Sequence, residues 1–166
     1  MKLRELNLAT SIGTYDIDVH FNRLEETIRD FEENEGLQII PDFQRGHVWS
    51  EEQQIAFIRF LLNNPRRRQR LYFNCSEWGT KDMVLVDGLQ RLTAIRLFMS
   101  DKLKIDGRVF TEFEDHKIFG GRYSIKFNVN NLKTRNEILT WYIEMNTGGT
   151  PHTKKEIQKV VDLIDE

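Results

Sequence analysis

Residues 83–99 constrain the fold most strongly, because they join an apolar strand, a glycine turn and a helix with no linker between them. Residues 83–86 are apolar at every position, which predicts a strand that is buried on both faces and lies in the middle of its sheet. Asp87-Gly88 ends this strand. Residues 90–99 then carry apolar side chains at helical spacing, at Leu92, Ile95 and Met99. The segment predicts a fold in which a helix follows directly from a buried strand.

Two helices and a short strand are expected before this segment. Residues 16–35 are strongly acidic and have an apolar helical spacing, which predicts a helix entered near Asn22 and stopped at Gly36. Residues 37–40 predict a short strand that ends at Pro41. A capping box of Ser50 and Gln53 opens the second helix. The buried face of this helix is expected at Ile55, Ile58 and Leu62, and Pro65 is expected to end it.

The rest of the chain adds strands and two helices. Residues 71–74 predict a strand that joins residues 83–86 around Gly79. Asp106-Gly107 and Gly120-Gly121 are hairpin signals, and residues 123–127 alternate as a half-buried strand. Two final helices are expected. The apolar positions of the first are Ile138, Trp141, Tyr142 and Met145. The second begins with a capping box of Thr153 and Glu156, and its apolar positions are Ile157, Val160, Val161 and Ile164. The fold class is α+β (mixed α/β), with a small mixed sheet flanked by helices.

Length and charge restrict the class of protein. The 166 residues fit one compact domain, which we place at residues 1–166. A net charge of −2 argues against a polycation that coats nucleic acid, so that any DNA contact must come from a local patch. The single cysteine, Cys75, and the lack of a long apolar run predict a cytoplasmic protein with no membrane association. The four histidines lie far apart, and no metal site is predicted.

The turn between residues 84 and 93 is the first candidate site. A glycine turn into a helix places free backbone N–H groups at one point, where a phosphate is the usual ligand. Arg91 can bind that phosphate bidentately, and Asp87 can orient a sugar hydroxyl, a metal ion or a water. The alternative is that Asp87 is only a helix cap and Arg91 a surface residue.

Residues 40–49 form a second cluster, in which Pro41 and two aromatic residues surround the polar pair Gln44-Arg45. Loops of this kind often form binding sites. The alternative is a packed connection in which Phe43 and Trp49 fill the core and Arg45 pairs with an acid.

Three separated motifs carry a resemblance to a known family. Ile-Pro-x-Phe-Gln-Arg-x-x-x-Trp at residues 40–49, Val-Asp-Gly-x-Gln-Arg-Leu-Thr at residues 86–93 and Asn-x-Gly-Gly-x-Pro at residues 146–151 occur in this order. Together they resemble the ParB/sulfiredoxin-like superfamily domain with a DGQQR motif, which forms the N-terminal part of GmrSD-type restriction enzymes and related phage-defence proteins. The resemblance covers about residues 20–160.

The resemblance implies a site for a nucleoside triphosphate with Mg²⁺, and in many members hydrolysis coupled to DNA cleavage by a separate nuclease domain. By motif position, the catalytic candidates are Asp87, Arg91, Gln44 and Arg45. The nucleotide-binding candidates are Gly88, Gln90, Thr93, Asn146, Gly148 and Gly149. Leu89 replaces the first glutamine of the family motif, which removes one polar contact.

An arginine run is a candidate nucleic-acid contact. Arg66, Arg67, Arg68 and Arg70 lie together with no acid among them, and a solvated basic turn is the alternative. We therefore expect a regulatory nucleotide-binding domain that acts with DNA, a nuclease or another protein partner. The alternatives are a non-enzymatic DNA- or protein-binding module that keeps the fold without hydrolysis, and a decoy that inhibits a full-length restriction enzyme.

Overall fold

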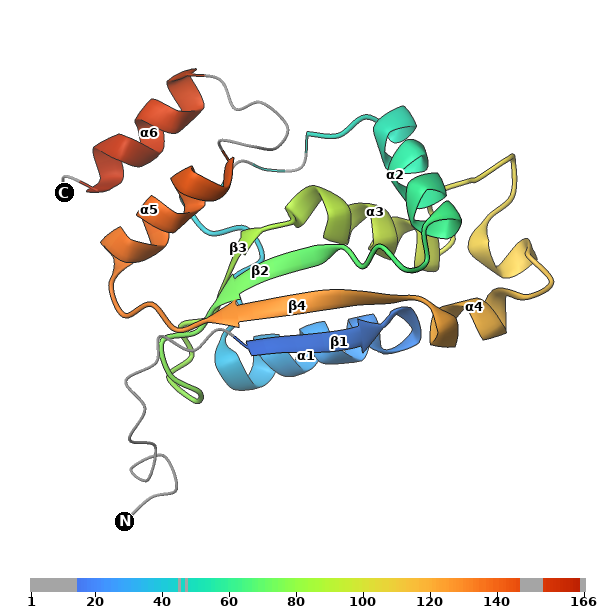
Figure 1. Ribbon diagram of the computed structural model, residues 1–166, viewed down its shortest axis with the longest axis horizontal. Helices are drawn as coiled ribbons and strands as arrows, with labels where there is room; N and C mark the ends of the chain where they lie inside the picture. The colour runs from blue at the N-terminus through green and yellow to red at the C-terminus, as the bar shows by residue number, and fades with distance from the viewer. Residues whose placement is uncertain (1–14, 45, 47, 147–153, 165–166) are drawn as a thin grey trace, which may run out of the picture.

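The structure is a computed structural model that describes residues 15–44, 46, 48–146 and 154–164. These ranges hold a four-stranded mixed sheet and six α-helices (Figure 1), which confirms the predicted fold class. In chain order the elements are β1 (Tyr15–His20), the 3-10 turn η2 (Phe21–Arg23), α1 (Leu24–Glu35), α2 (Glu51–Asn63), β2 (Arg70–Asn74), β3 (Val84–Asp87), α3 (Leu89–Met99), η3 (Phe110–Glu112), α4 (His116–Arg122), β4 (Ser124–Asn130), α5 (Arg135–Asn146) and α6 (Lys154–Ile164). No helix in the described ranges is long and apolar enough to cross a bilayer.

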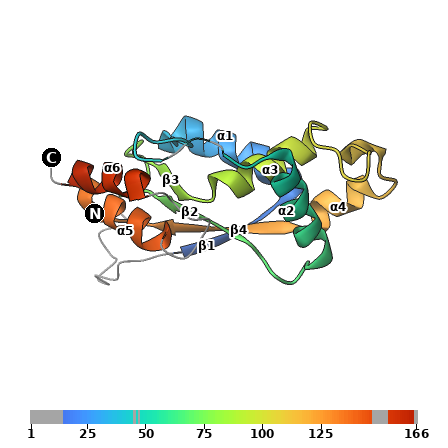
Figure 2. The ribbon, with the colours of Figure 1, turned by 90° about the horizontal axis from the view of Figure 1, so that it is seen from above.

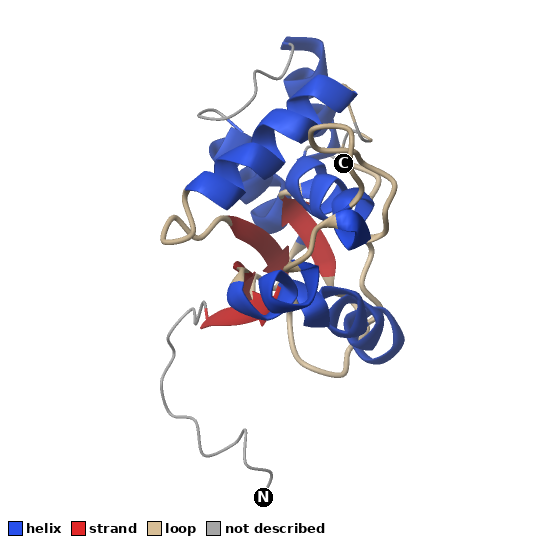
Figure 3. Ribbon diagram, turned by 90° about the vertical axis from the view of Figure 1, so that its right-hand side faces the viewer, coloured by secondary structure: helices blue, strands red, loops and turns tan. Residues whose placement is uncertain are grey.

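The strands lie in the order β1-β4-β2-β3. The pairs β1/β4 and β2/β3 are antiparallel, whereas β2/β4 is parallel. Since β4 has strands on both sides, its apolar positions Ile125, Phe127 and Val129 form the centre of the core and are almost fully buried. Helices lie on both sides of the sheet (Figure 3).

The larger core joins one face of the sheet to α1, α2 and α3. Phe73 of β2 and Phe127 of β4 pack with ring centroids 4.7 Å apart, and Phe31 of α1 contacts both rings. Figure 2 shows α1 and α3 next to each other beside the sheet. An ion pair between Glu25 of α1 and Arg96 of α3 joins the two helices at their exposed edge.

A second, smaller core holds α5 and α6 against β3. Val86 of β3 and Leu139 of α5 are both fully buried in it, and the Phe43 ring lies 5.2 Å from Tyr142. Successive residues of a strand point to opposite faces, so Leu85 enters the larger core and Val86 the smaller one. This arrangement fixes β3 between two layers of helices, directly before the candidate site.

Several local sequence signals are confirmed. Gly36 ends α1 with a left-handed backbone, at φ 63°. The Ser50/Gln53 capping box opens α2, with both of its reciprocal hydrogen bonds present. Asp106-Gly107 makes a tight turn between Ile105 and Arg108, whose backbones pair in both directions.

Other predictions about the first half of the chain are wrong. Residues 15–20, for which no strand was predicted, form β1, in which Ile17 and Val19 alternate with polar residues. Residues 37–40 form only one parallel bridge, from Gln38 to Val84, and no strand. In α2, Leu61 and Ile58 are buried, while Ile55 and Leu62 are only half-buried.

The position of β3 also differs from the prediction. It is an edge strand and not a central one. The strand is nevertheless apolar on both faces because helices bury both of them. Gln38 covers the free edge: its N–H donates to Met83 O, and its carbonyl accepts from Leu85 N–H. Gly120-Gly121 lies inside α4 and makes no hairpin. A Cβ at Gly120 would lie 3.1 Å from Asn22 Cβ, so the glycine allows α4 to pack closely on η2.

The prediction for the last helix is confirmed in part. Val160 is buried against α5, whereas Ile157, Val161 and Ile164 are half-buried. Thr153 of the predicted capping box lies outside the described residues.

Candidate functional site

The junction of β3 and α3 presents an uncapped helix N-terminus. Gly88 is the N-cap residue, with φ 112° and ψ 11°, and no side chain caps the helix. The first helical hydrogen bond runs from Leu92 N–H to Gly88 O at 2.8 Å. The N–H groups of Leu89, Gln90 and Arg91 therefore lack an acceptor within the helix. These groups and the helix dipole favour an anion at this point.

Glycine is required at position 88 for two reasons. Its positive φ lies in the left-handed region that disfavours residues with a Cβ. A Cβ here would also lie 2.4 Å from Leu71 Cδ2 and 3.3 Å from Leu71 Cα on β2. The close packing of β2 against the turn thus sets the direction in which α3 leaves the sheet.

Asp87 and Arg91 form an ion pair across the first turn of α3. Arg91 Nη2 donates to Asp87 Oδ2 at 2.6 Å, and the two side chains are 25% and 29% exposed for Arg91 and Asp87, respectively. Arg91 Nε is buried and has no hydrogen-bond partner within the described part of the chain. The structure thus brings two of the four predicted catalytic residues together at the rim of the junction.

Gln90 holds the preceding loop against the start of α3. Its Oε1 accepts from Val48 N–H at 2.9 Å and from Trp49 N–H at 3.1 Å. Its Nε2 donates to Gly46 O at 3.2 Å. The Gln90 side chain therefore connects the second and first motifs through backbone groups.

Gln44 connects the same two motifs from the other direction. Its Nε2 donates to Leu85 O in β3 at 2.7 Å, while its own N–H donates to Pro41 O. Arg45, the neighbouring catalytic candidate, lies outside the described residues, as do Gly148 and Gly149. Asn146 ends α5, where its Nδ2 donates to Tyr142 O at 2.7 Å.

An ion pair that no sequence pattern predicted fixes the other side of this loop. Arg135 of α5 donates from Nη1 and Nη2 to the two carboxylate oxygens of Asp42, at 3.1 and 2.6 Å. This hydrogen bond from Arg135 is the main reason why the pKa of Asp42 lies below its usual range. No sequence signal links two charged residues so far apart in the chain.

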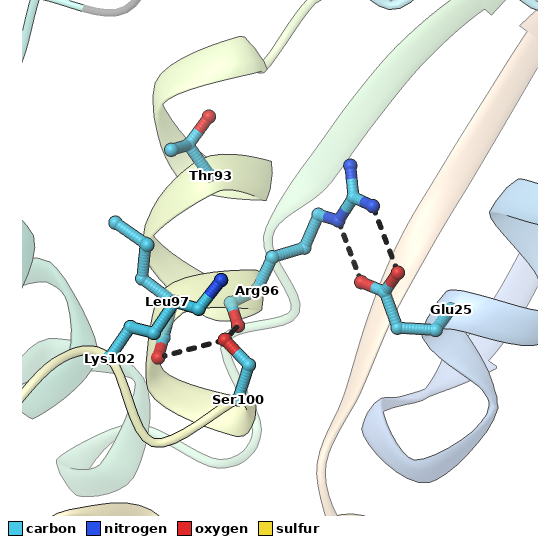
Figure 4. A pocket seen from close by; sticks show the side chains of 6 residues that line it. All are labelled: Glu25, Thr93, Arg96, Leu97, Ser100 and Lys102. Atoms are coloured by element: carbon cyan, nitrogen blue, oxygen red, sulfur yellow. Dashed lines mark hydrogen bonds and ion pairs between the residues drawn. The ribbon is translucent and has the colours of Figure 1, made fainter.

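Thr93 lies away from the Asp87–Arg91 pair. It is two residues beyond Arg91, so the two side chains leave α3 roughly 200° apart around its axis. Thr93 instead lines a separate hollow of about 360 Å³ between α1 and α3. Figure 4 shows this hollow, with Arg96 reaching from α3 to Glu25 on α1.

The arginine run lies in the exposed turn between α2 and β2 and ends at Arg70, the first residue of β2. Arg66, Arg67, Arg68 and Arg70 are all exposed. Arg68 Nη1 pairs with Asp18 Oδ2 of β1 at 2.6 Å. Lys126 of β4 lies 3.3 Å from the other oxygen of the same carboxylate. Part of the positive charge is therefore neutralised by β1, which the sequence analysis had not recognised as a strand.

Among the residues that the structure describes, no group of three His, Cys, Asp or Glu side chains could hold a metal ion. A divalent ion at the junction would thus have Asp87 as its protein carboxylate and would take its other ligands from phosphate and water.

Comparison with known families identifies the chain. The family model for the N-terminal domain of the GmrSD restriction endonuclease matches residues 25–122. The matched range covers more than half of the 166 residues and includes the loop of Gln44, the Asp87–Arg91 pair and the arginine run. No curated protein and no solved structure matches the chain. The chain belongs to the family of the GmrSD restriction endonuclease N-terminal domain.

Proposed function

We propose that this domain binds the phosphates of a nucleoside triphosphate at the β3–α3 junction and regulates a restriction or phage-defence system. The observation that carries the proposal is the uncapped N-terminus of α3 with the Arg91 guanidinium beside it. Arg91 uses Nη2 for Asp87, which leaves Nη1 available for a phosphate oxygen. Membership of a restriction-enzyme family supports the biological setting.

The residues at the junction fit a magnesium nucleotide. Mg²⁺ at phosphate sites is usually bound by one or two carboxylates together with phosphate oxygens and waters. Asp87 Oδ2 accepts from Arg91, so Oδ1 is the oxygen that remains for the ion. Gly88 allows the phosphate to approach the backbone, and Gln90 keeps the backbone of Gly46 and Val48 beside it.

Hydrolysis is the second step of the proposal. Gln44 uses Nε2 to bind Leu85 O, so its Oε1 is the atom that would accept a hydrogen bond from the attacking water. Arg45 would stabilise charge that develops on a phosphoryl oxygen. Leu89, which replaces a glutamine of the family motif, is buried in the larger core and adds packing at this position.

A panel of ATP, GTP, CTP and UTP, with and without Mg²⁺, tests the proposal by thermal shift. A ligand at 100 times its Kd adds about 2.7 kcal/mol of stability, or roughly 5–10 °C for a domain of this size. We expect one nucleotide to produce this shift in the wild type and in Arg96→Ala, an arginine variant of the same helix. Arg91→Ala should abolish it. No shift with any nucleotide would overturn the proposal, and phosphate release by the responsive pair would test hydrolysis.

Contact with DNA through the arginine turn is the second candidate function. Arg66 and Arg67 are exposed and have no acidic partner among the described residues, which favours a phosphate contact over a purely structural role. This function needs no hydrolysis and would make the domain a binding module for DNA next to a nuclease partner.

A further inference from the structure

A partly enclosed cavity of about 190 Å³ lies at the C-terminal end of α3. Aromatic rings from α3, η3, α4 and the segments beside them form most of its wall. These rings belong to Phe98, Phe110, Phe113, Phe119 and Tyr123. Phe98 and Phe110 are buried, whereas the other three residues are half-buried.

The aromatic wall is held in place by contacts between its own rings. Phe119 and Tyr123 stack with centroids 4.1 Å apart. Phe98 and Phe110 meet edge to face at 5.2 Å, and both also contact Phe119. Rings that support one another in this way keep a cavity open without a ligand, which is typical of small-molecule sites.

Three polar side chains line the cavity, those of Asp115, His116 and Tyr123. Tyr123 OH already donates to Leu62 O at 3.2 Å. His116 Nδ1 lies 2.7 Å from Phe113 O, and because a carbonyl only accepts, Nδ1 is the donor in this contact. Asp115 adds an exposed carboxylate. A ligand that presents an N–H donor complements this carboxylate.

We propose that this cavity binds a small planar nitrogen heterocycle that inserts its ring among the aromatic side chains and directs an N–H group to the Asp115 carboxylate. The volume suits this class, since an apolar cavity of roughly 150 Å³ accommodates benzene. A larger ligand would have to extend out of this cavity of about 190 Å³. The ligand is either a free heterocycle or a nucleobase, which share the same ring and donor chemistry.

The cavity is separate from the proposed phosphate site. Phe98 is ten residues beyond Gly88 on α3, which corresponds to roughly 15 Å along the helix axis. The cavity and the Asp87–Arg91 pair share no lining residue. The heterocycle proposal therefore does not depend on nucleotide binding at the β3–α3 junction.

Titration by two-dimensional ¹H–¹⁵N NMR with indole and 1-methylindole tests the proposal on the full chain. Indole should shift the amide signals of Phe113 and His116 and leave that of Val86 unchanged. Loss of the N–H donor should weaken binding of 1-methylindole about tenfold, the effect of one hydrogen bond to a charged group. Equal binding of the two probes, or shifts spread over the whole surface, would overturn the proposal.

Two variants locate the site. Asp115→Asn is an exposed substitution that should leave folding intact and reduce the preference for indole over 1-methylindole, while Glu114→Gln, its neighbour outside the cavity, should not. Leu62→Trp should fill the cavity and abolish binding. If Leu62→Trp fails to fold, the comparison of Asp115→Asn with Glu114→Gln still decides. Cytosine as a third probe separates the two sources, since tighter binding of cytosine than of indole would identify a nucleobase.

Discussion

Gln44 and Leu85 are joined by a hydrogen bond from the side-chain Nε2 to the backbone carbonyl, at 2.7 Å. Leu85 is fully buried in β3, so the bond attaches the loop of the first motif to a rigid strand. Gln90 attaches the end of the same loop to α3. Both glutamines thus position backbone around the β3–α3 junction before any ligand arrives.

Removal of the Gln90 side chain should loosen this loop. Gln90→Ala loses three hydrogen bonds to Gly46, Val48 and Trp49, and we expect a loss of about 1–3 kcal/mol in the free energy of unfolding. Gln90→Glu keeps the acceptor for Val48 and Trp49 and should lose less. Urea unfolding gives the stability, and hydrogen exchange at Val48 and Trp49 reports the loop. Unchanged exchange in Gln90→Ala would show that the loop is held by other contacts.

Gly88 should tolerate no side chain. Gly88→Ala places a Cβ at positive φ and within 2.4 Å of Leu71 Cδ2, so it should lower the free energy of unfolding by about 2–4 kcal/mol. Gly107→Ala is the matched control, because Gly107 also has a positive φ, 78°, but open space around it. Its cost should stay near 1 kcal/mol. Similar midpoints for the two variants in urea unfolding would contradict the steric explanation.

The Asp42–Arg135 pair should contribute stability that depends on pH. Because Arg135 lowers the folded-state pKa of Asp42, the contribution is present above the unfolded-state value near pH 3.9 and is lost as the pH falls through the lower folded-state value. Arg135→Ala should raise the pKa of Asp42 in an NMR titration. The pKa of Asp101, which hydrogen bonds from Thr111 lower, should not change and serves as the internal reference. An unaltered Asp42 titration would show that the ion pair does not form in solution.

Cys75 should be chemically inert in the folded protein. Burial, with added repulsion from Asp82 and Glu35, raises the pKa of its thiol to about 11. Since the thiolate is the reactive form, iodoacetamide at pH 8 should label the native protein far more slowly than the protein in urea, where a thiol has a pKa near 8.5. Mass spectrometry measures both rates. Rapid labelling of the native form would contradict the buried position of Cys75.

Local signals explain what could be predicted from the sequence. The capping box at Ser50 and the glycine end of α1 are set by residues within four positions of each other, so they can be predicted without the fold. The alternation of apolar and polar side chains in residues 15–20 is also a local signal, but the strand was not predicted because Asp16 and Asp18 made the segment look like part of the acidic stretch before α1. In the fold these acids face Lys126 and Arg68, which belong to distant elements.

The candidate site shows the same division. Motif spacing identified Asp87, Gly88, Gln90 and Arg91, and the structure places these residues together at the junction. Motif spacing could not predict that the side chains of Gln90 and Gln44 bind backbone groups, because those backbone groups lie more than forty residues away in the chain. The edge position of β3 was also hidden, since α5 and α6 bury a face that an exposed edge strand would leave polar.

The arginine turn permits a direct test of DNA contact. Arg66 and Arg67 are exposed without an acidic partner among the described residues, whereas Arg68 is paired with Asp18. The double variant Arg66→Ala/Arg67→Ala should weaken binding to duplex DNA and reduce the slope of log K against log[salt] by about 2, one unit for each lost phosphate contact. Arg68→Ala should change the slope less, because its charge is already neutralised. Fluorescence anisotropy at several salt concentrations measures these slopes. An affinity that does not depend on salt would exclude this turn as a DNA contact and would leave the β3–α3 junction as the candidate functional surface.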